Sequence, residues 1–355
     1  MTRGTRKIIS IFTTVLAAFF LPACGMAIIP VPTSTATASA VPTLTATPSP
    51  LPTATAIPTP TPTSEPAWYR TLSPSEANSK YQYAQVTNPH ARVYPTFQDA
   101  LNKSFNYGHL PYSPAYVAYM ATKNQDGRTF YDLATGNWMD GQDLQLLTPS
   151  RFSGVLLTRQ VDFRFGWVLA STQSVNAAGS AVRAYSRYQV VHEISGAEER
   201  PDYVAIGADE WLPENSVAWI KPQVPADADP HYCRFLYVNL AQQTLSVYNG
   251  CKLVFATLIS SGADPLPTYA GQFNILYKVD YTTLQPPEGS ITQYYLEGVP
   301  DFMTYYYNLG FHGAYWHDNF GAPASHGCIN LSLTDIQWLY AWVNLGDRVI
   351  ISPGK

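Results

Sequence analysis

The sequence carries little charge, since Asp, Glu, Lys and Arg make up 13% of its 355 residues and 21 Lys and Arg face 25 Asp and Glu. Proteins bind polyanions through clustered cations that release counterions, so this balance excludes nucleic acid as a favoured partner. Hydrophobic residues reach 46%, a share that excludes a disordered or fibrous chain. We therefore expect a folded protein with two or three domains.

Helical periodicity is also scarce, and cysteine is limited to four residues. In their place the chain has 29 Pro, 25 Tyr and 8 Trp. Proline punctuates turns, and aromatic residues are enriched in strands. The composition predicts a mainly β fold.

The N-terminal apolar run, residues 8–21, has 14 residues and follows three basic ones. A bilayer-spanning helix needs about 20, so the layout favours an export signal over a permanent span. Leu-Pro-Ala-Cys at 21–24 resembles a bacterial lipobox, in which Cys24 becomes the acylated first residue. We predict a signal peptide at 1–23 and an exported, lipid-anchored protein at the outer face of the cytoplasmic membrane. An ordinary cleaved signal is the alternative.

Residues 24–66 read as a linker, because the stretch from Pro30 to Pro66 holds ten Pro, eleven Thr and a single charge, Glu65. Such a segment cannot bury a core and favours extended, polyproline-like conformations. It separates the signal from the rest of the chain.

Residues 67–225 contain a weak internal repeat. Tyr131, Trp138, Met139 and Leu144 are echoed by Tyr203, Trp211, Leu212 and Val217. Glycine and acidic residues fill the gaps, as turns between short strands require. The pattern looks like two SH3-like barrels of the kind that accompany bacterial wall enzymes, with a wall-binding role as one interpretation. Core packing is the favoured interpretation for most of the four tryptophans, Trp138, Trp167, Trp211 and Trp219.

The C-terminal region, 232–352, opens with hairpin signals. Strands are predicted at 235–240, 244–248 and 252–256, the last two joined by Asn249-Gly250. In a simple antiparallel register Cys233 would face Cys251, so an exported protein could form a disulfide there. Two buried thiols are the alternative.

Three of the seven histidines, His312, His317 and His326, fall within fifteen residues and are followed by Cys328. A thiol with a pKa near 8.5 is a weak nucleophile at pH 7 unless an imidazole takes its proton. His312 or His326 could do so. Gly327 allows a close approach of the backbone, so successive amide N–H groups could form an oxyanion site.

Ser-His-Gly-Cys-Ile-Asn at 325–330, with His-Gly fourteen residues before its histidine, resembles the signature of the YkuD-type L,D-transpeptidases. The resemblance covers about 232–352, including 238–248 and Pro-Thr-Tyr-Ala-Gly-Gln-Phe at 267–273, where Tyr269 replaces the usual proline. It implies a YkuD-like β-sandwich. It also implies Cys328 as nucleophile, His312 as its proton acceptor and donor, and the Gly313 carbonyl as the group that orients His312.

The resemblance further implies that His326, Gly327 and Cys328 form the oxyanion pocket and that Ser325 and Asn330 shape the site. It implies peptidoglycan stem peptides as substrate, a thioester intermediate, a cross-linking role in wall biogenesis and cell shape, and no metal or organic cofactor. Two alternatives stay open: an L,D-carboxypeptidase in which water resolves the thioester, and a non-catalytic wall-binding lipoprotein.

Two other classes of site are less compatible with the residues. A zinc site could use the histidines and Cys328, but no HExxH spacing and no paired CxxC occur. In papain-like NlpC/P60 endopeptidases the cysteine precedes its histidine, whereas here Cys328 follows all seven histidines.

A helix is predicted directly after this segment. Ser332 and Asp335 form a capping pattern, and apolar residues recur at 336, 339, 340 and 343, with Leu345-Gly346 as the end. We expect the positive end of this helix to favour a Cys328 thiolate. A last strand is predicted at 348–351.

Overall fold

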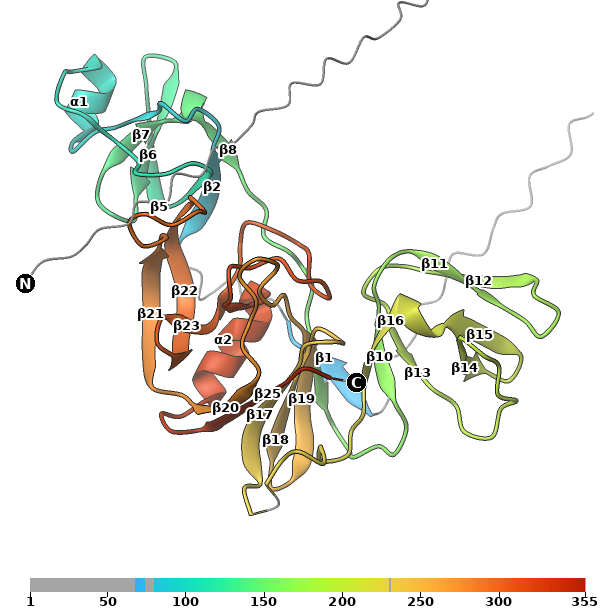
Figure 1. Ribbon diagram of the computed structural model, residues 1–355. Helices are drawn as coiled ribbons and strands as arrows, with labels where there is room; N and C mark the ends of the chain where they lie inside the picture. Colours follow the sequence, from blue (N-terminus) through green and yellow to red (C-terminus); the bar gives the residue numbers. More distant parts are fainter. Residues whose placement is uncertain (1–67, 74–79, 230, 355) are drawn as a thin grey trace, which may run out of the picture. The chain divides into compact units, whose positions relative to one another are not determined.

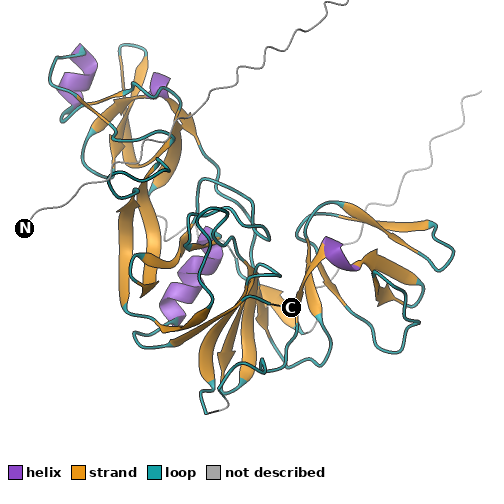
Figure 2. Ribbon diagram, viewed as in Figure 1, coloured by secondary structure: helices purple, strands orange, loops and turns teal. Residues whose placement is uncertain are grey.

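The computed structural model describes residues 68–73, 80–229 and 231–354, which fall in a single unit. The predicted signal peptide, the linker and Cys24 lie outside the described residues. Strands dominate the described part, as the composition predicts (Figure 2). Within it there are two α-helices, α1 (Phe97–Asn102) and α2 (Leu333–Trp342), and neither is long and apolar enough to cross a membrane.

One seven-stranded sheet underlies the C-terminal domain (residues 232–352). Its order is β1 (Tyr69–Thr71), β9 (Val155–Leu157), β19 (Lys252–Leu258), β18 (Thr244–Asn249), β17 (Arg234–Asn239), β25 (Arg348–Ser352) and β20 (Gly271–Asn274). The predicted hairpins 235–256 and the last strand are therefore confirmed. Two strands from the region upstream of residue 225, β1 and β9, extend the sheet beyond the hairpins.

A second sheet crosses the boundary between the upstream region and the C-terminal domain. Its main path is β24 (Ile329–Leu331), β23 (Leu309–Gly313), β22 (Tyr295–Tyr306), β5 (Ala115–Gln125), β2 (Gln82–Val86) and β8 (Leu144–Leu146). The strands β21 (Tyr277–Leu284), β6 (Arg128–Leu133) and β7 (Trp138–Asp140) pair off this path. We call residues 80–148 the first module. It also contains α1 and the short pair β3 (Arg92–Val93) and β4 (Gly108–His109).

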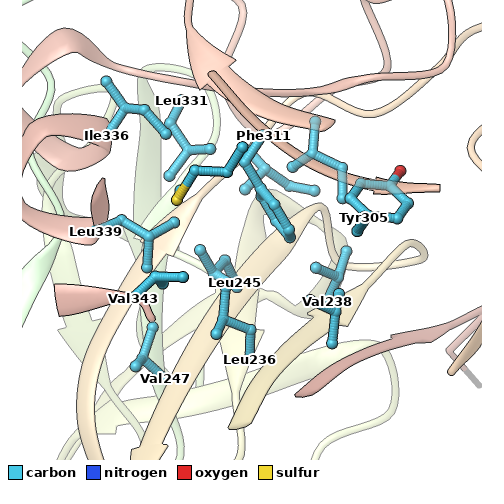
Figure 3. Packing of buried hydrophobic residues seen from close by; sticks show 14 of the residues in the cluster. Leu236, Val238, Leu245, Val247, Tyr305, Phe311, Leu331, Ile336, Leu339 and Val343 are labelled. Carbon is cyan, nitrogen blue, oxygen red and sulfur yellow. The ribbon is translucent and has the colours of Figure 1, made fainter. Parts of the chain in front are cut away.

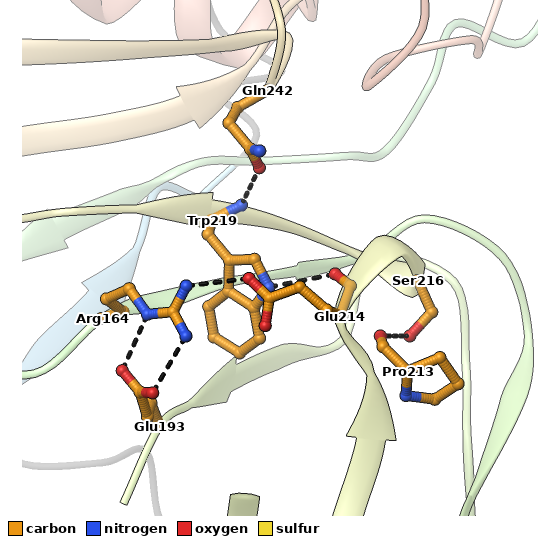
Figure 4. Close-up of polar contacts among 7 residues, drawn as sticks. All are labelled: Arg164, Glu193, Pro213, Glu214, Ser216, Trp219 and Gln242. Atoms are coloured by element: carbon orange, nitrogen blue, oxygen red, sulfur yellow. Dashed lines mark hydrogen bonds and ion pairs between the residues drawn. The ribbon is translucent and has the colours of Figure 1, made fainter. Parts of the chain in front are cut away.

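Residues 161–220, the second module, have two sheets of their own. One is β13 (Val190–His192), β10 (Phe165–Val168) and β16 (Val217–Ile220). The other is β12 (Ala181–Tyr185), β11 (Thr172–Val175), β15 (Glu210–Pro213) and β14 (Tyr203–Gly207). Arg164 hydrogen-bonds Glu193 and Glu214 there and lies over the Trp219 ring (Figure 4).

The repeat seen in the sequence corresponds to a repeated local structure. Trp138 in β7 and Trp211 in β15 are each followed by a short 3-10 helix, at Gly141–Asp143 and Glu214–Ser216, and then by a strand. Trp167, Trp211 and Trp219 are buried, which confirms core packing for three of the four tryptophans, while Trp138 is half-buried. The SH3-like assignment of the modules stays a prediction.

The core of the C-terminal domain lies between its two sheets and α2. Leu236, Val238, Leu245 and Val247 project from one sheet towards Phe311, Leu331, Ile336 and Leu339 (Figure 3). Helix α2 begins where predicted, since Ser332 Oγ accepts from Asp335 N at 3.2 Å, and it packs against β22 and β23 (Figure 1). It ends at Trp342, three residues before the predicted stop. The buried sandwich holds β23 and β24, which carry the site, in fixed positions.

The predicted register of the first hairpin is wrong by one residue. Asn239 pairs with Thr244, so the loop has four residues rather than three, and Gln243 takes a left-handed φ of 51°. Cys233 and Cys251 lie just beyond the paired strands and are joined by a disulfide with a Cα–Cα distance of 4.3 Å. The one-residue difference in register does not prevent the disulfide, because both cysteines lie outside the paired residues of β17 and β18.

Candidate active site

His312 lies on β23 and is 2% exposed. Its Nδ1 is 3.2 Å from the Gly313 carbonyl oxygen. Since a carbonyl only accepts, Nδ1 must donate, and Nε2 is the nitrogen left to accept a proton. Burial lowers the pKa of His312 to about 4, against a smaller opposing effect of the Gly313 carbonyl. At neutral pH the resting imidazole is therefore an uncharged base.

Cys328 immediately precedes β24, which runs parallel to β23 with His312 paired to Asn330. Both Cys328 and His312 line one cavity of about 400 Å³. Among the described residues Cys328 is the free cysteine, and it is half-buried. Burial raises the pKa of its thiol to about 11, while a hydrogen bond from the Gly310 backbone N–H acts in the opposite direction. The structure thus brings together the predicted nucleophile and base as a neutral thiol and a neutral imidazole.

The expected help from a helix N-terminus is absent at Cys328. Strand β24 separates the cysteine from Ser332, and four extended residues span about 13 Å. A helix dipole acts mainly within its first turn, and here the Ser332 side chain already caps that turn.

The turn before Cys328 is held by side chains. Ser325 Oγ accepts from the Gly327 N–H at 3.1 Å and donates to the Cys328 carbonyl. Gly327 has a φ of 115°, which a residue with a side chain rarely adopts, and its carbonyl accepts from Thr268 Oγ1 at 2.9 Å. Because the Gly327 N–H is engaged, the backbone N–H groups of His326 and Cys328, which have no partner among the described residues, are the available oxyanion donors.

Asn330 and His317 lie next to each other. Asn330 Nδ2 is 2.9 Å from His317 Nε2, and the Asn319 N–H donates to His317 Nδ1 at 3.1 Å. Asn330 lines the cavity and is 1% exposed, yet its Oδ1 has no hydrogen-bond partner among the described residues. Buried polar atoms without a partner are uncommon in folded proteins, so the Asn330 amide is suited to hydrogen-bond a bound ligand.

His326 is exposed and stacks on Tyr294 with ring centroids 4.6 Å apart. Partial burial lowers its pKa. The alternative of a zinc site would use the clustered histidines and Cys328. In the described ranges, no three His, Cys, Asp or Glu side chains are grouped so that they could hold a metal ion.

Reasoning from sequence missed several residues of the site. Tyr294 lines the cavity and contacts His326, but no motif in the sequence marks it as part of the site. Thr268 lies in the segment 267–273, which is part of the resemblance to the YkuD family, so the sequence did contain a pattern that could have pointed to it. Pro114 and Tyr116 also line the cavity, and they come from the first module, about two hundred residues away along the chain. No local pattern could have found those two.

Comparison with known proteins agrees with this geometry. Residues 234–351 match the model of the YkuD family, described as an L,D-transpeptidase catalytic domain. A proposed L,D-transpeptidase of Bacillus subtilis (strain 168), YciB, is 25% identical over 158 residues, which cover 39% of this chain and 76% of that protein.

Among solved structures, an Enterococcus faecium L,D-transpeptidase is 28% identical with a TM-score of 0.32, over 34% of this chain and 50% of that one. A Mycobacterium smegmatis L,D-transpeptidase is 17% identical with a TM-score of 0.32, over 58% and 91%. The chain thus spans half the length of the Enterococcus protein. The family match and the arrangement of Cys328, His312 and Gly313 coincide, and residues 234–351 belong to the YkuD family of L,D-transpeptidase catalytic domains.

Proposed function

We propose that this protein is a cell-wall L,D-transpeptidase that cross-links peptidoglycan through a thioester on Cys328. The observation that carries the proposal is that His312 on β23 and Cys328, immediately before the parallel strand β24, line one cavity. The bond from Nδ1 to the Gly313 carbonyl leaves Nε2 of His312 to accept a proton. A nucleophile, a base and a group that orients the base are the three parts that covalent catalysis requires.

The proposed first half-reaction starts from two neutral groups. The Cys328 sulfur attacks the carbonyl carbon of the amide between a diamino acid and a terminal D-alanine, while its proton moves to Nε2 of His312. The C–S bond forms, the C–N bond breaks, and His312 returns the proton to the D-alanine amine. Coupling proton transfer to attack fits a thiol whose pKa is raised to about 11 and an imidazole whose pKa is lowered to about 4.

In the second half-reaction the side-chain amine of another stem attacks the thioester. The new C–N bond replaces the C–S bond, the amine proton passes through His312 back to the sulfur, and two stems are joined through their third residues. The N–H groups of His326 and Cys328 would stabilise the oxyanion in both halves. The Asn330 amide, buried and not fully hydrogen-bonded among the described residues, would hydrogen-bond the substrate peptide.

Intact mass after incubation with a carbapenem tests the nucleophile, because the family resemblance implies that such compounds acylate the thiol. We expect one adduct, mapped to the peptide that contains Cys328, and none in Cys328→Ala. An adduct elsewhere, or an unmodified wild type, would contradict the proposal. Product analysis with a tetrapeptide stem, with and without a second amine, then distinguishes cross-linking from hydrolysis by a carboxypeptidase and from a purely wall-binding protein.

The role of His312 is tested by His312→Ala, with His109→Ala as a matched control. His109 Nδ1 also contacts a backbone carbonyl, that of Ala91 at 3.0 Å, but it lies in the first module and does not line the cavity. We expect His312→Ala to lower kcat by roughly 10²–10⁴ and His109→Ala to leave it unchanged. Equal losses in both variants would remove His312 from the mechanism.

We further propose that the protein is exported and anchored by a lipid on Cys24, which supports a position next to the wall. The basis is the layout of the N-terminal sequence alone. Mass spectrometry of the mature N-terminus tests it: a diacylglyceryl group on Cys24 is the expected result, and an unmodified chain starting at another residue would refute the anchor.

A further inference from the structure

The cavity that holds Cys328 is built by two parts of the chain. The C-terminal domain supplies one side, including Tyr294 and His326. The first module supplies Pro114 and Tyr116. The Tyr116 side chain is half-buried and packs against the aromatic cluster that borders the cavity, together with Tyr294. Removing the first module would therefore leave the cavity without one of its walls.

Backbone hydrogen bonds fix this wall in register with the C-terminal domain. Strands β5 and β22 pair in parallel, with Ala115 opposite Tyr295 and Tyr116 opposite Leu296. The Tyr295 N–H also donates to the Pro114 carbonyl at 3.0 Å. A one-residue slip would turn Tyr116 to the other face of the sheet, so the pairing specifies which side chain enters the cavity wall.

The loop that follows His312 is tied to the same wall. The Tyr315 hydroxyl donates to the Glu297 carbonyl at 2.6 Å and lies 3.4 Å from the Tyr116 carbonyl. Its ring stacks on Tyr83 of the first module at 3.8 Å, with 12° between the planes. Tyr315 is three residues beyond His312, so the first module contacts both the substrate cavity and the segment that carries the base.

The chemistry of the lining indicates what Tyr116 would contact. The cavity is lined by aromatic, aliphatic and neutral polar residues, and none of its described lining residues is Asp, Glu, Lys or Arg. An uncharged stretch of peptide fits such a lining, whereas a buried charge would lack a counter-charge.

We propose that Tyr116 is a specificity-determining residue for the donor stem peptide, so that the first module forms part of the substrate site. The inference rests on the proposed transpeptidase function. In it, the Tyr116 ring packs against the uncharged part of the donor and holds the scissile amide over Cys328. The first module would thus select the donor in addition to any wall-binding role.

The test compares Tyr116→Ala with Tyr116→Phe and Tyr107→Ala in the full chain. Tyr107 is also a half-buried tyrosine of the first module, but it does not line the cavity. With a tetrapeptide donor we expect Tyr116→Ala to raise KM about tenfold with kcat changed less, equivalent to ~1.4 kcal/mol of binding. Tyr116→Phe should keep KM within about threefold because the ring is retained, and Tyr107→Ala should match the wild type.

Alkylation of Cys328 by iodoacetamide, followed by peptide mapping, provides a second readout that does not require the donor peptide to fill the cavity. We expect an unchanged rate in Tyr116→Ala. An unchanged KM in Tyr116→Ala would overturn the inference. A rise in KM matched by an equal loss of alkylation rate and of thermal stability would also overturn it. A wild-type chain that turns over no stem peptide would instead refute the proposed function, so the two failures are distinguishable.

Discussion

The two upstream modules contact the C-terminal domain in different ways. The first module joins it by main-chain pairing, because β5 continues the sheet that holds β22, β23 and β24. The described strands of the second module pair only with one another. Its polar contacts with the C-terminal domain involve side chains. The Gln242 Oε1 accepts from the backbone N–H of Trp219 at 2.7 Å, and the Tyr188 hydroxyl donates to the Asp318 carbonyl at 2.8 Å.

The two modules share a local structure, but only one of them contributes to the cavity. Both modules contain the same strand, 3-10 helix and strand after a tryptophan. The lining of the catalytic cavity nevertheless includes residues of the first module and none from 161–220. The comparison therefore predicts that damage to the first module changes catalysis, whereas damage to the second changes stability alone.

The largest effect is expected from Gly298→Ala. Gly298 lies on β22 with a φ of 65°, and a Cβ there would be 2.4 Å from the Ala118 Cβ of the first module. A left-handed conformation costs a non-glycine residue ~1–2 kcal/mol, and overpacking adds ~1–3 kcal/mol. We expect about 3 kcal/mol less stability in urea unfolding and a KM for the tetrapeptide raised by more than tenfold, because the cavity wall is displaced.

Gly289→Ala is the matched control for that experiment. Gly289 has a φ of 81°, but no heavy atom lies within 4 Å of the position that its Cβ would occupy. The substitution carries the same backbone cost without the clash, so we expect ~1 kcal/mol of destabilisation and an unchanged KM. Similar KM values for the two variants would mean that β22 and the first module do not shape the donor site together.

Local turn and cap chemistry accounts for what could be predicted from the sequence. Asn249-Gly250 predicts the turn between β18 and β19 to within one residue: the turn lies at Gly250 and Cys251, which have φ of 58° and 59°, and Asn249 still pairs with Lys252. Ser332 with Asp335 specifies the start of α2, because a cap acts over a few residues. The register of the preceding hairpin was predicted wrongly because no such local signal exists there. Gln243 adopts a left-handed conformation that is unusual for a glutamine.

Long-range pairing accounts for what could not be predicted. Asp335 is a helix-capping residue in the sequence, yet its buried carboxylate also accepts from the Gly154 N–H at 2.8 Å, across 181 residues. The pairing of β5 with β22 is equally remote. Such contacts depend on complementary surfaces formed only after folding, and no periodicity records them. The chemistry of Cys328 and His312 was therefore legible from the sequence, but the wall that faces them was not.

A smaller, pH-dependent effect is expected at Glu297, which is 1% exposed on β22 and accepts from the Thr135 N–H of the first module at 2.9 Å. Burial raises the pKa of Glu297 to about 7 from 4.5. A raised carboxyl pKa means that the native state binds the proton more tightly, so this stabilisation is complete below pH 4.5 and is lost as the pH rises to about 7.

Glu297→Gln tests this linkage because glutamine keeps a carbonyl oxygen for the Thr135 N–H and does not titrate. Relative to the wild type, we expect the variant to gain on the order of 3 kcal/mol in unfolding free energy between pH 4.5 and pH 8. Urea unfolding at several pH values measures the difference. A wild type that becomes relatively more stable as the pH rises would show that Glu297 is ionised in the folded protein.

The smallest effect on catalysis is expected in the second module, at Arg164. Its guanidinium donates to both carboxylate oxygens of Glu193, at 2.7 and 2.9 Å, and to Glu214 at 2.8 Å (Figure 4). The hydrogen bond to Arg164 lowers the pKa of Glu193, so this stabilisation holds above pH 4.5 and weakens as the pH falls. Bidentate, partly buried pairs exceed the usual contribution of exposed ones.

We therefore expect Arg164→Ala to lower the unfolding free energy by ~1–2 kcal/mol at pH 7 while kcat/KM for the tetrapeptide stays within about twofold. Arg183→Ala is the control, since Arg183 is 3.8 Å from Glu210 with a 63% exposed side chain and should change stability by ~0.5 kcal/mol or less. If Arg164→Ala lowered kcat/KM as much as Tyr116→Ala, side-chain packing would couple the second module to the cavity as effectively as shared strands do, and the contrast between the modules would fail.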